Sequence, residues 1–143
     1  MPLNTALILL ALIGQVFLTY YVYVVMIRGR FAAVSSEQVS REQYVLVEGE
    51  PRAQARATRN LANQFELPVL FYAVVLMLVA INRVTMFDVI VAWVFVVSRL
   101  VHHIVHVGRD DATLRTPVFA VGMTAVALIA LHGLIIVLGE AFI

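Results

Sequence analysis

Residues 56–68 read RATRNLANQFELP and open a long apolar segment, although they contain two arginines, two asparagines and a glutamate. Four of these polar side chains recur at i, i+3, i+4 and i+7 and therefore share one face of a helix: Arg56, Arg59, Asn60 and Asn63. A polar face on a membrane helix must point into protein or water, because lipid cannot solvate it. The stretch therefore predicts a membrane helix whose first turns bind an anionic, polar ligand.

The chain around this stretch has the composition of a membrane protein. Of its 143 residues, 62% are hydrophobic and only 13% are charged, and the mean hydropathy is +0.95. A soluble domain of this length does not need so much apolar surface. Nucleic acid is not an expected partner, because no basic arm or aromatic platform stands outside the apolar segments.

The chain has no cysteine, so the sequence excludes a disulfide framework, a thiolate metal site and a cysteine nucleophile. A reaction that uses a thiol would need a second molecule to bring it. All ten of the Lys and Arg residues are arginine, whose planar guanidinium holds a carboxylate or phosphate better than an ammonium does. A compositional bias explains the absence of lysine equally well.

Four apolar segments are long enough to cross a bilayer. They predict an all-α, integral membrane four-helix bundle that forms a single domain over residues 1–143. The spans are expected at about residues 3–30, 56–81, 86–107 and 113–141, with a polar loop at residues 31–55. Pro68 lies inside the second span, where it frees the carbonyl of Gln64 and predicts a kink or a loosened turn.

Arginines are distributed unequally between the connections of these spans. Only Arg83 lies in the second connection, and eight flank the first and third: Arg28, Arg30, Arg41, Arg52, Arg56, Arg59, Arg109 and Arg115. The positive-inside rule then predicts that the first and third connections are cytoplasmic. Both termini are expected on the opposite side of the membrane.

Polar residues of all four spans gather at this cytoplasmic level, whereas randomly tolerated polar residues would scatter over both leaflets. They are Arg28 and Arg30 on the first span, residues 56–66 on the second, residues 99–106 on the third and Arg115 on the fourth. Arg99 lies about two turns, roughly 10 Å, below the end of the third span. Glu66 lies at a similar depth and is expected to pair with it, either as a structural ion pair or within a ligand site.

The third span also carries three histidines: His102, His103 and His106. Counted from Arg99, His102 or His103 lies at i+3 or i+4 and His106 lies at i+7. The third span therefore repeats the spacing of the second. His102 and His106 could hold a metal at i, i+4, but a His-Glu-x-x-His motif is absent, so we expect hydrogen bonding into a polar cavity instead. His103 is expected to snorkel towards the surface, and His132 on the fourth span is expected to be structural.

Arg115 lies at the start of the fourth span, where a cation opposes the helix dipole. This arrangement is tolerable if an anion lies between the arginine and the free N–H groups of the helix and binds to both. The alternative is that Arg115 only anchors the helix end in the cytoplasm.

Together these residues resemble the membrane-associated proteins in eicosanoid and glutathione metabolism, and the chain looks like a bacterial-type member similar to the microsomal glutathione transferases. The family motif Arg-Ala-x-x-Asn is matched by Arg56, Ala57 and Asn60. A second signature, an arginine followed by an aromatic or histidine three and seven residues later, is matched by Arg99, His102 and His106. An arginine at the start of the fourth span matches Arg115.

The resemblance implies a homotrimer in the lipid bilayer that binds glutathione, as a cosubstrate, between neighbouring subunits. In the family, arginines of the first two spans hold the carboxylates of glutathione, which here implies Arg28 or Arg30, Arg56 and Arg59. The fourth-span arginine stabilises the thiolate, which implies a catalytic role for Arg115. Asn63 stands where the family often has a glutamate, with Glu66 one turn later, and His106 replaces an aromatic residue.

These observations support two main hypotheses. The first is a glutathione-dependent transferase or peroxidase that attacks a lipophilic electrophile or hydroperoxide from the bilayer. The second is a non-catalytic membrane protein that binds glutathione or a lipid head group in the same pocket. A channel or carrier is disfavoured, because a pore would need polar residues along the full depth of its helices.

Overall fold

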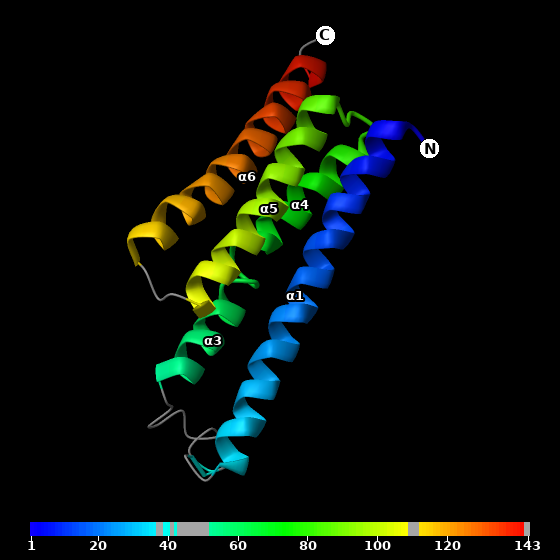
Figure 1. The fold of residues 1–143 in the computed structure, drawn as a ribbon. Helices are drawn as coiled ribbons and strands as arrows, with labels where there is room; N and C mark the ends of the chain where they lie inside the picture. The colour runs from blue at the N-terminus through cyan, green and yellow to red at the C-terminus, as the bar shows by residue number, and fades with distance from the viewer. Residues whose placement is uncertain (37–38, 41, 43–51, 109–111, 142–143) are drawn as a thin grey trace.

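The computed structural model describes residues 1–36, 39, 40, 42, 52–108 and 112–141. Its helices are α1 (Leu3–Ser35), α3 (Arg52–Ala62), α4 (Leu67–Ala80), α5 (Met86–Gly108) and α6 (Ala112–Ala141) (Figure 1). Four stretches are long and apolar enough to cross a membrane: Leu3–Ser35, Gln54–Ala80, Met86–Val105 and Thr113–Ala141. The described residues contain no strand. The predicted all-α fold with four membrane spans is therefore confirmed.

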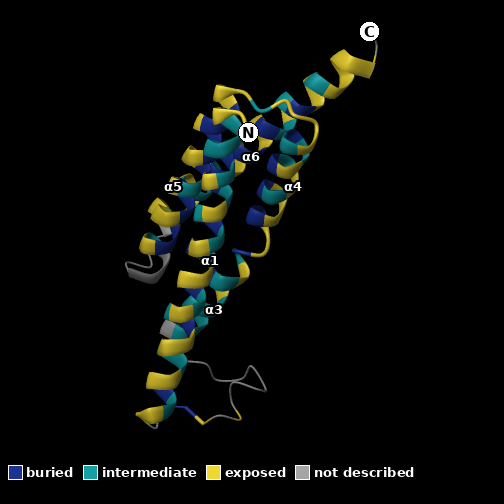
Figure 2. Ribbon diagram, turned by 90° about the vertical axis from the view of Figure 1, so that its right-hand side faces the viewer, coloured by how far each residue is buried: buried dark blue, intermediate teal, exposed yellow. Residues whose placement is uncertain are grey.

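The hydrophobic core lies between α1, α4, α5 and α6. Phe71 and Phe95 stack at its centre with ring centroids 4.3 Å apart, and both side chains are fully buried. Side chains that point away from the bundle are largely apolar as well, such as Phe17, which is 69% exposed. Figure 2 shows these exposed positions as bands along the outer faces of the helices. Such a surface fits contact with lipid chains.

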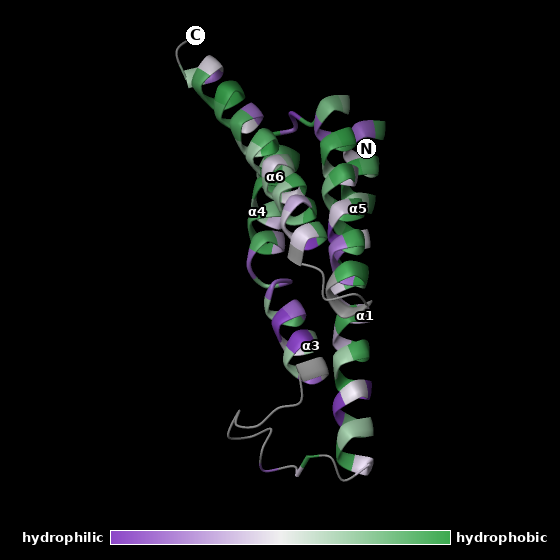
Figure 3. Ribbon diagram, turned by 60° about the vertical axis from the view of Figure 1, so that its left-hand side comes forward, coloured by the Kyte–Doolittle hydropathy of each residue, from purple (hydrophilic) through white to green (hydrophobic). Residues whose placement is uncertain are grey.

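Helix α1 continues past the expected end of its span at residue 30. Its 33 residues give a rise of about 50 Å, which exceeds the roughly 30 Å of a bilayer's hydrocarbon core. Close to this point, α1 packs against α3, and Arg30 Nη2 donates a hydrogen bond to Thr58 Oγ1 at 3.1 Å. Figure 3 shows hydrophilic residues on α3 and on the neighbouring part of α1, at the end of the bundle away from the chain start.

The irregularity expected near Pro68 is an interruption of the second span. Helix α3 ends at Ala62, and α4 begins at Leu67 with Pro68 in its first turn. The chain between them is held by tight-turn hydrogen bonds, such as Gln64 N–H to the Leu61 carbonyl at 2.9 Å. These bonds leave the Asn63 carbonyl available to a side chain from another helix.

Candidate functional site

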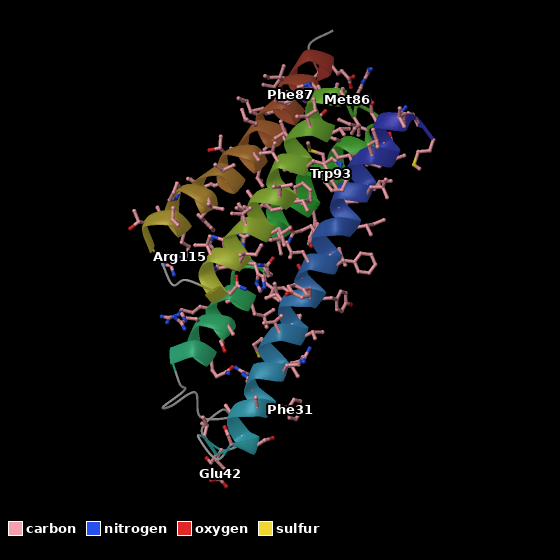
Figure 4. All side chains as sticks on the ribbon, viewed as in Figure 1. Phe31, Glu42, Met86, Phe87, Trp93 and Arg115 are labelled. Carbon is pink, nitrogen blue, oxygen red and sulfur yellow. The ribbon has the colours of Figure 1, made fainter. Side chains whose placement is uncertain are left out.

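A cavity of about 490 Å³ opens between α3, α5 and α6 at the polar end of the bundle. Its lining combines cations, a carboxylate, an imidazole and small or aromatic side chains: Arg59, Ala62, Asn63, Glu66, His102, Arg115, Thr116 and Phe119. Figure 4 shows Arg115 at the start of α6, at the opposite end from Met86 and Phe87. We call this space the arginine cavity. Its size falls within the range of about 300–1,000 Å³ that is usual for small-molecule sites.

The fold brings five of the predicted site residues into this lining: Arg59, Asn63, Glu66, His102 and Arg115. They come from three helices and from the break between α3 and α4. Two of them are cations and one is a carboxylate, so the lining suits a ligand that carries more than one negative charge and one positive charge. His102 is buried, and its ring packs against Phe119 with centroids 5.8 Å apart.

Arg99 lies behind the wall of the arginine cavity rather than in its lining. Its side chain is fully buried, and its Nη2 donates a hydrogen bond to the Asn63 carbonyl at 3.1 Å. Its guanidinium carbon also lies 5.7 Å from the centre of the Phe119 ring. The break before Pro68 exposes the carbonyl that receives this hydrogen bond. Arg99 therefore fixes the wall that Asn63 and Phe119 present to the cavity.

Arg99 and Glu66 form no direct ion pair, although both are among the described residues. The predicted partner of Arg99 is replaced by a backbone carbonyl, and Glu66 is exposed and lines the cavity. The reason is local geometry: Glu66 is the last residue before α4, and its side chain is exposed at the break between α3 and α4. Its carboxylate lines the cavity and still acts electrostatically on the buried guanidinium.

Asn60 does not line the arginine cavity. Its Nδ2 donates a hydrogen bond to His103 Nδ1 at 2.6 Å, and both side chains are buried. The His103 ring in turn meets Tyr21 of α1 edge-on at 5.3 Å. The expectation that His103 snorkels to the surface is therefore wrong, because Asn60 gives it a buried partner. Successive helical residues point about 100° apart, so Arg59 reaches the cavity while Asn60 faces α1 and α5.

Arg28, Arg30 and Arg56, whose side chains the structure describes, do not line this cavity in the single chain. Arg28 is exposed on α1, Arg30 is bound to Thr58, and Arg56 is half-buried on α3. His106 belongs to α5, but its side chain lies outside the described residues. A second buried amide pair, absent from the predicted set, supports the break from the α1 side: Gln15 Nε2 donates to Gln64 Oε1 at 3.0 Å.

Besides the small side chain of Ala62, sequence reasoning missed two lining residues, Thr116 and Phe119. Both follow Arg115 on the first turns of α6, and Phe119 comes four residues later, which places it on the same face. That spacing is a signal that the sequence itself contains. Phe119 closes the cavity against His102 and Arg99, and Thr116 adds a hydroxyl beside the arginine.

A comparison with known proteins identifies the family of the chain. The family model of the MAPEG family matches residues 8–135. The chain belongs to the MAPEG family. Neither the comparison with curated proteins nor the one with solved structures gives a match. The MAPEG family includes glutathione transferases and peroxidases among other members, and its members generally use glutathione.

The geometry of Glu66 leads to a test of whether this residue has a structural role. Because Glu66 is exposed and forms no ion pair with Arg99, Glu66→Gln should change the free energy of unfolding by less than about 1 kcal/mol. Melting of the detergent-solubilised protein without ligand measures this change. Arg99→Ala is the comparison variant, since it leaves a cavity and an unpaired carbonyl and should destabilise strongly. If both variants lost the same free energy of unfolding, the result would support a structural ion pair between Arg99 and Glu66.

Proposed function

We propose that this MAPEG protein is a glutathione-dependent transferase or peroxidase that acts on lipophilic electrophiles or hydroperoxides from the bilayer. The observation that carries the proposal is the meeting of Arg59, Glu66 and Arg115 around one cavity. Glutathione carries two carboxylates, one ammonium and a thiol. The cavity therefore offers a guanidinium for a carboxylate, a carboxylate for the ammonium and a second guanidinium for the sulfur.

Arg115 is the residue to which we assign thiol activation. A free thiol with a pKa near 8.5 is only a few per cent ionised at neutral pH. Lowering that pKa by two units requires roughly 2.7 kcal/mol of preferential stabilisation of the thiolate. A guanidinium in a site with little water can supply this amount. Arg115 also lies in the first turns of α6, whose N–H groups add to the attraction of an anion.

The chemistry then needs no general base from the protein. The thiolate sulfur attacks the electrophilic carbon, a C–S bond forms, and the leaving group departs with the electron pair. With a hydroperoxide, the sulfur attacks the distal oxygen, the O–O bond breaks, and the alkoxide takes a proton. The thiol of a second glutathione then attacks the resulting sulfenic acid: the S–S bond of glutathione disulfide forms, the S–O bond breaks, and the hydroxyl leaves as water.

The proposal includes a homotrimer, in which arginines of a neighbouring α1 complete the site. Its support is the position of Arg28, which is exposed on α1 and stands outside the cavity of its own chain. We also propose that the polar end of the bundle faces the cytoplasm, because eight of the ten arginines flank the first and third connections. Glutathione would then enter from the compartment that contains it.

A second candidate is a binding protein without catalysis. The positions of Arg59 and Arg115 favour it. Both lie near helix ends, at the depth in the membrane where lipid phosphates are found. The same cavity would then hold a lipid head group or glutathione as a regulatory ligand. The two candidates differ in whether the bound sulfur is ionised and reactive.

The first prediction from the proposal concerns binding. Glutathione at 100 times its dissociation constant should stabilise the folded protein by about 2.7 kcal/mol per site, which a thermal shift in detergent measures. Arg59→Ala should remove a charge-assisted contact of roughly 1.5–3 kcal/mol and weaken binding about 10- to 100-fold. Arg83→Ala is the matched control, because Arg83 lies at the other end and pairs with Glu140. Glutathione that stabilises neither wild type nor control contradicts the assignment.

The second prediction separates the enzyme from the binding protein. Arg115→Leu should retain glutathione, because other arginines hold its carboxylates, but should lose the bound thiolate. The rate with a chlorodinitrobenzene should fall about 10-fold for each pKa unit that the bound thiol regains, less any gain in nucleophilicity. Ultraviolet absorbance of the thiolate, titrated with pH, measures the ionisation, and Arg115→Lys is the charge-conserving control. A wild-type complex without thiolate at neutral pH favours the binding protein.

A further inference from the structure

The outer side of α5 and α6 is hollowed by a concave apolar space that shares no lining residue with the arginine cavity. A cavity of about 600 Å³ lies between the two helices, with Trp93 of α5 and Val118 of α6 in its lining. A second cavity of about 450 Å³ continues along α6 as far as Leu128. Because Val94 and Val121 line both cavities, the two form one hollow, which we call the α5–α6 groove.

The α5–α6 groove offers hydrocarbon contacts and few hydrogen bonds to an occupant. Ser98 is the polar residue of the larger cavity, and its hydroxyl already donates to the Phe95 carbonyl at 2.7 Å. Thr124 is the polar residue of the smaller cavity, and apart from Trp93 the other lining residues are aliphatic. Among the residues that the structure describes, no charged side chain lines either cavity. Such walls fit an alkyl chain and would leave a polar ligand without partners.

A close contact between α5 and α6 separates the α5–α6 groove from the arginine cavity. At Gly122, α6 approaches α5 so closely that a Cβ atom would lie 2.8 Å from Ser98 Oγ and 3.7 Å from Arg99 Cδ. Ser98 lines the groove, whereas Arg99 lies behind the wall of the arginine cavity. The two spaces therefore lie on either side of one helix–helix contact.

Arg115 lies beside both spaces at the start of α6. Residues three and four positions later on a helix are neighbours of the first residue on the helix surface. Val118, three positions after Arg115, lines the groove, and Phe119, four positions after it, lines the arginine cavity. Val118 follows Arg115 by a rise of only about 4.5 Å along the helix. A molecule in the groove can therefore present its end group at the arginine cavity.

The length of the groove fits one extended alkyl chain. Its lining on α5 runs from Val101 to Val89, which is a rise of about 18 Å. Just beyond Val89, His132 Nδ1 of α6 lies 2.8 Å from Asp88 Oδ1 of α5, and this hydrogen bond joins the two helices. The hydrocarbon core of a bilayer is roughly 30 Å thick, so the groove is about as long as the chain region of one leaflet.

We propose that the α5–α6 groove binds the alkyl chain of a single-chain lipid substrate, whose electrophilic end group then lies beside Arg115. This substrate class rests on the proposed function and narrows it to lipids with the electrophile at the polar end, such as long-chain α,β-unsaturated aldehydes. The thiolate adds to the β-carbon and forms the C–S bond, and the electron pair of the C=C bond moves towards the carbonyl oxygen. Water then protonates the α-carbon, and no group leaves.

Trp93 reports whether the groove is occupied, because it is the only tryptophan of the chain and lines the groove. It remains 40% exposed, and Figure 4 shows it between the levels of Met86 and Arg115. In wild-type protein in lipid nanodiscs, a dodecanol with bromine on its terminal carbon should quench the Trp93 fluorescence along a saturable curve. Excess unlabelled dodecanol should reverse the quenching, because both alcohols compete for one site.

Two outcomes of this measurement overturn the proposal. Quenching that rises in proportion to the added alcohol, and that unlabelled dodecanol does not reverse, shows contact with bulk lipid only. Absence of quenching shows that a second copy of the chain or another partner covers the groove. The measurement needs neither a variant nor turnover.

A second test uses a variant that fills the groove. Val121→Phe places a ring where the two cavities meet, and this overpacking should lower the ratio of kcat/KM for dodecenal to kcat/KM for a chlorodinitrobenzene by about 10-fold or more. Val137→Phe is the matched control and should keep the wild-type ratio, because Val137 is also exposed on α6 but lines neither cavity. An unchanged ratio in a Val121→Phe protein that melts as cooperatively as wild type overturns the proposal.

The two measurements together separate the groove from the proposed function. Saturable quenching without turnover of either electrophile refutes the glutathione-dependent reaction and retains the chain site. Turnover of both electrophiles without saturable quenching refutes the chain site and retains the reaction.

Discussion

Lipid chains offer no hydrogen-bond partner, so each polar group within the membrane must find one inside the protein. The buried polar side chains of this chain are accordingly turned inwards: Gln15, Asn60, Gln64, Asp88, Ser98, Arg99, His102 and His103. Their contacts join helices that an apolar sequence pattern would leave free to rotate. Asn60 bonds to His103 between α3 and α5, and Gln15 bonds to Gln64 between α1 and the break. These contacts orient the helices that form the arginine cavity.

The interruption before Pro68 connects this constraint to the candidate site. Proline prevents the second span from continuing as one helix, and the freed Asn63 carbonyl receives the buried Arg99. The same break turns Glu66 outwards into a cavity that also contains Arg59 and Arg115. A straight helix would satisfy its own carbonyls and leave Arg99 without this acceptor. The break therefore places a buried cation, an exposed carboxylate and two accessible arginines around one space.

Much of this arrangement can be predicted from the sequence, because the level of a residue in a membrane span follows from the span ends. That rule alone puts Arg59, Glu66, His102 and Arg115 at one level of the bundle. The level of a residue does not tell which neighbouring helix its side chain faces. The rule therefore also assigns Asn60 to the site, although Asn60 forms a hydrogen bond with His103. The partner of Asp88, His132, lies 44 residues away, so the sequence signals only the helix cap at Thr85-x-x-Asp88 and not the contact between α5 and α6.

The central claim is that the arginine cavity is a glutathione site, and a structure of the protein in lipid nanodiscs with glutathione sulfonate tests it most directly. This analogue keeps the carboxylates and the ammonium and replaces the thiol by a permanent anion that cannot react. The account predicts ligand density in the cavity, with a carboxylate at Arg59, the ammonium at Glu66 and the sulfonate at Arg115. Density for the analogue at another site, or a cavity without it at saturating concentration, would contradict the account.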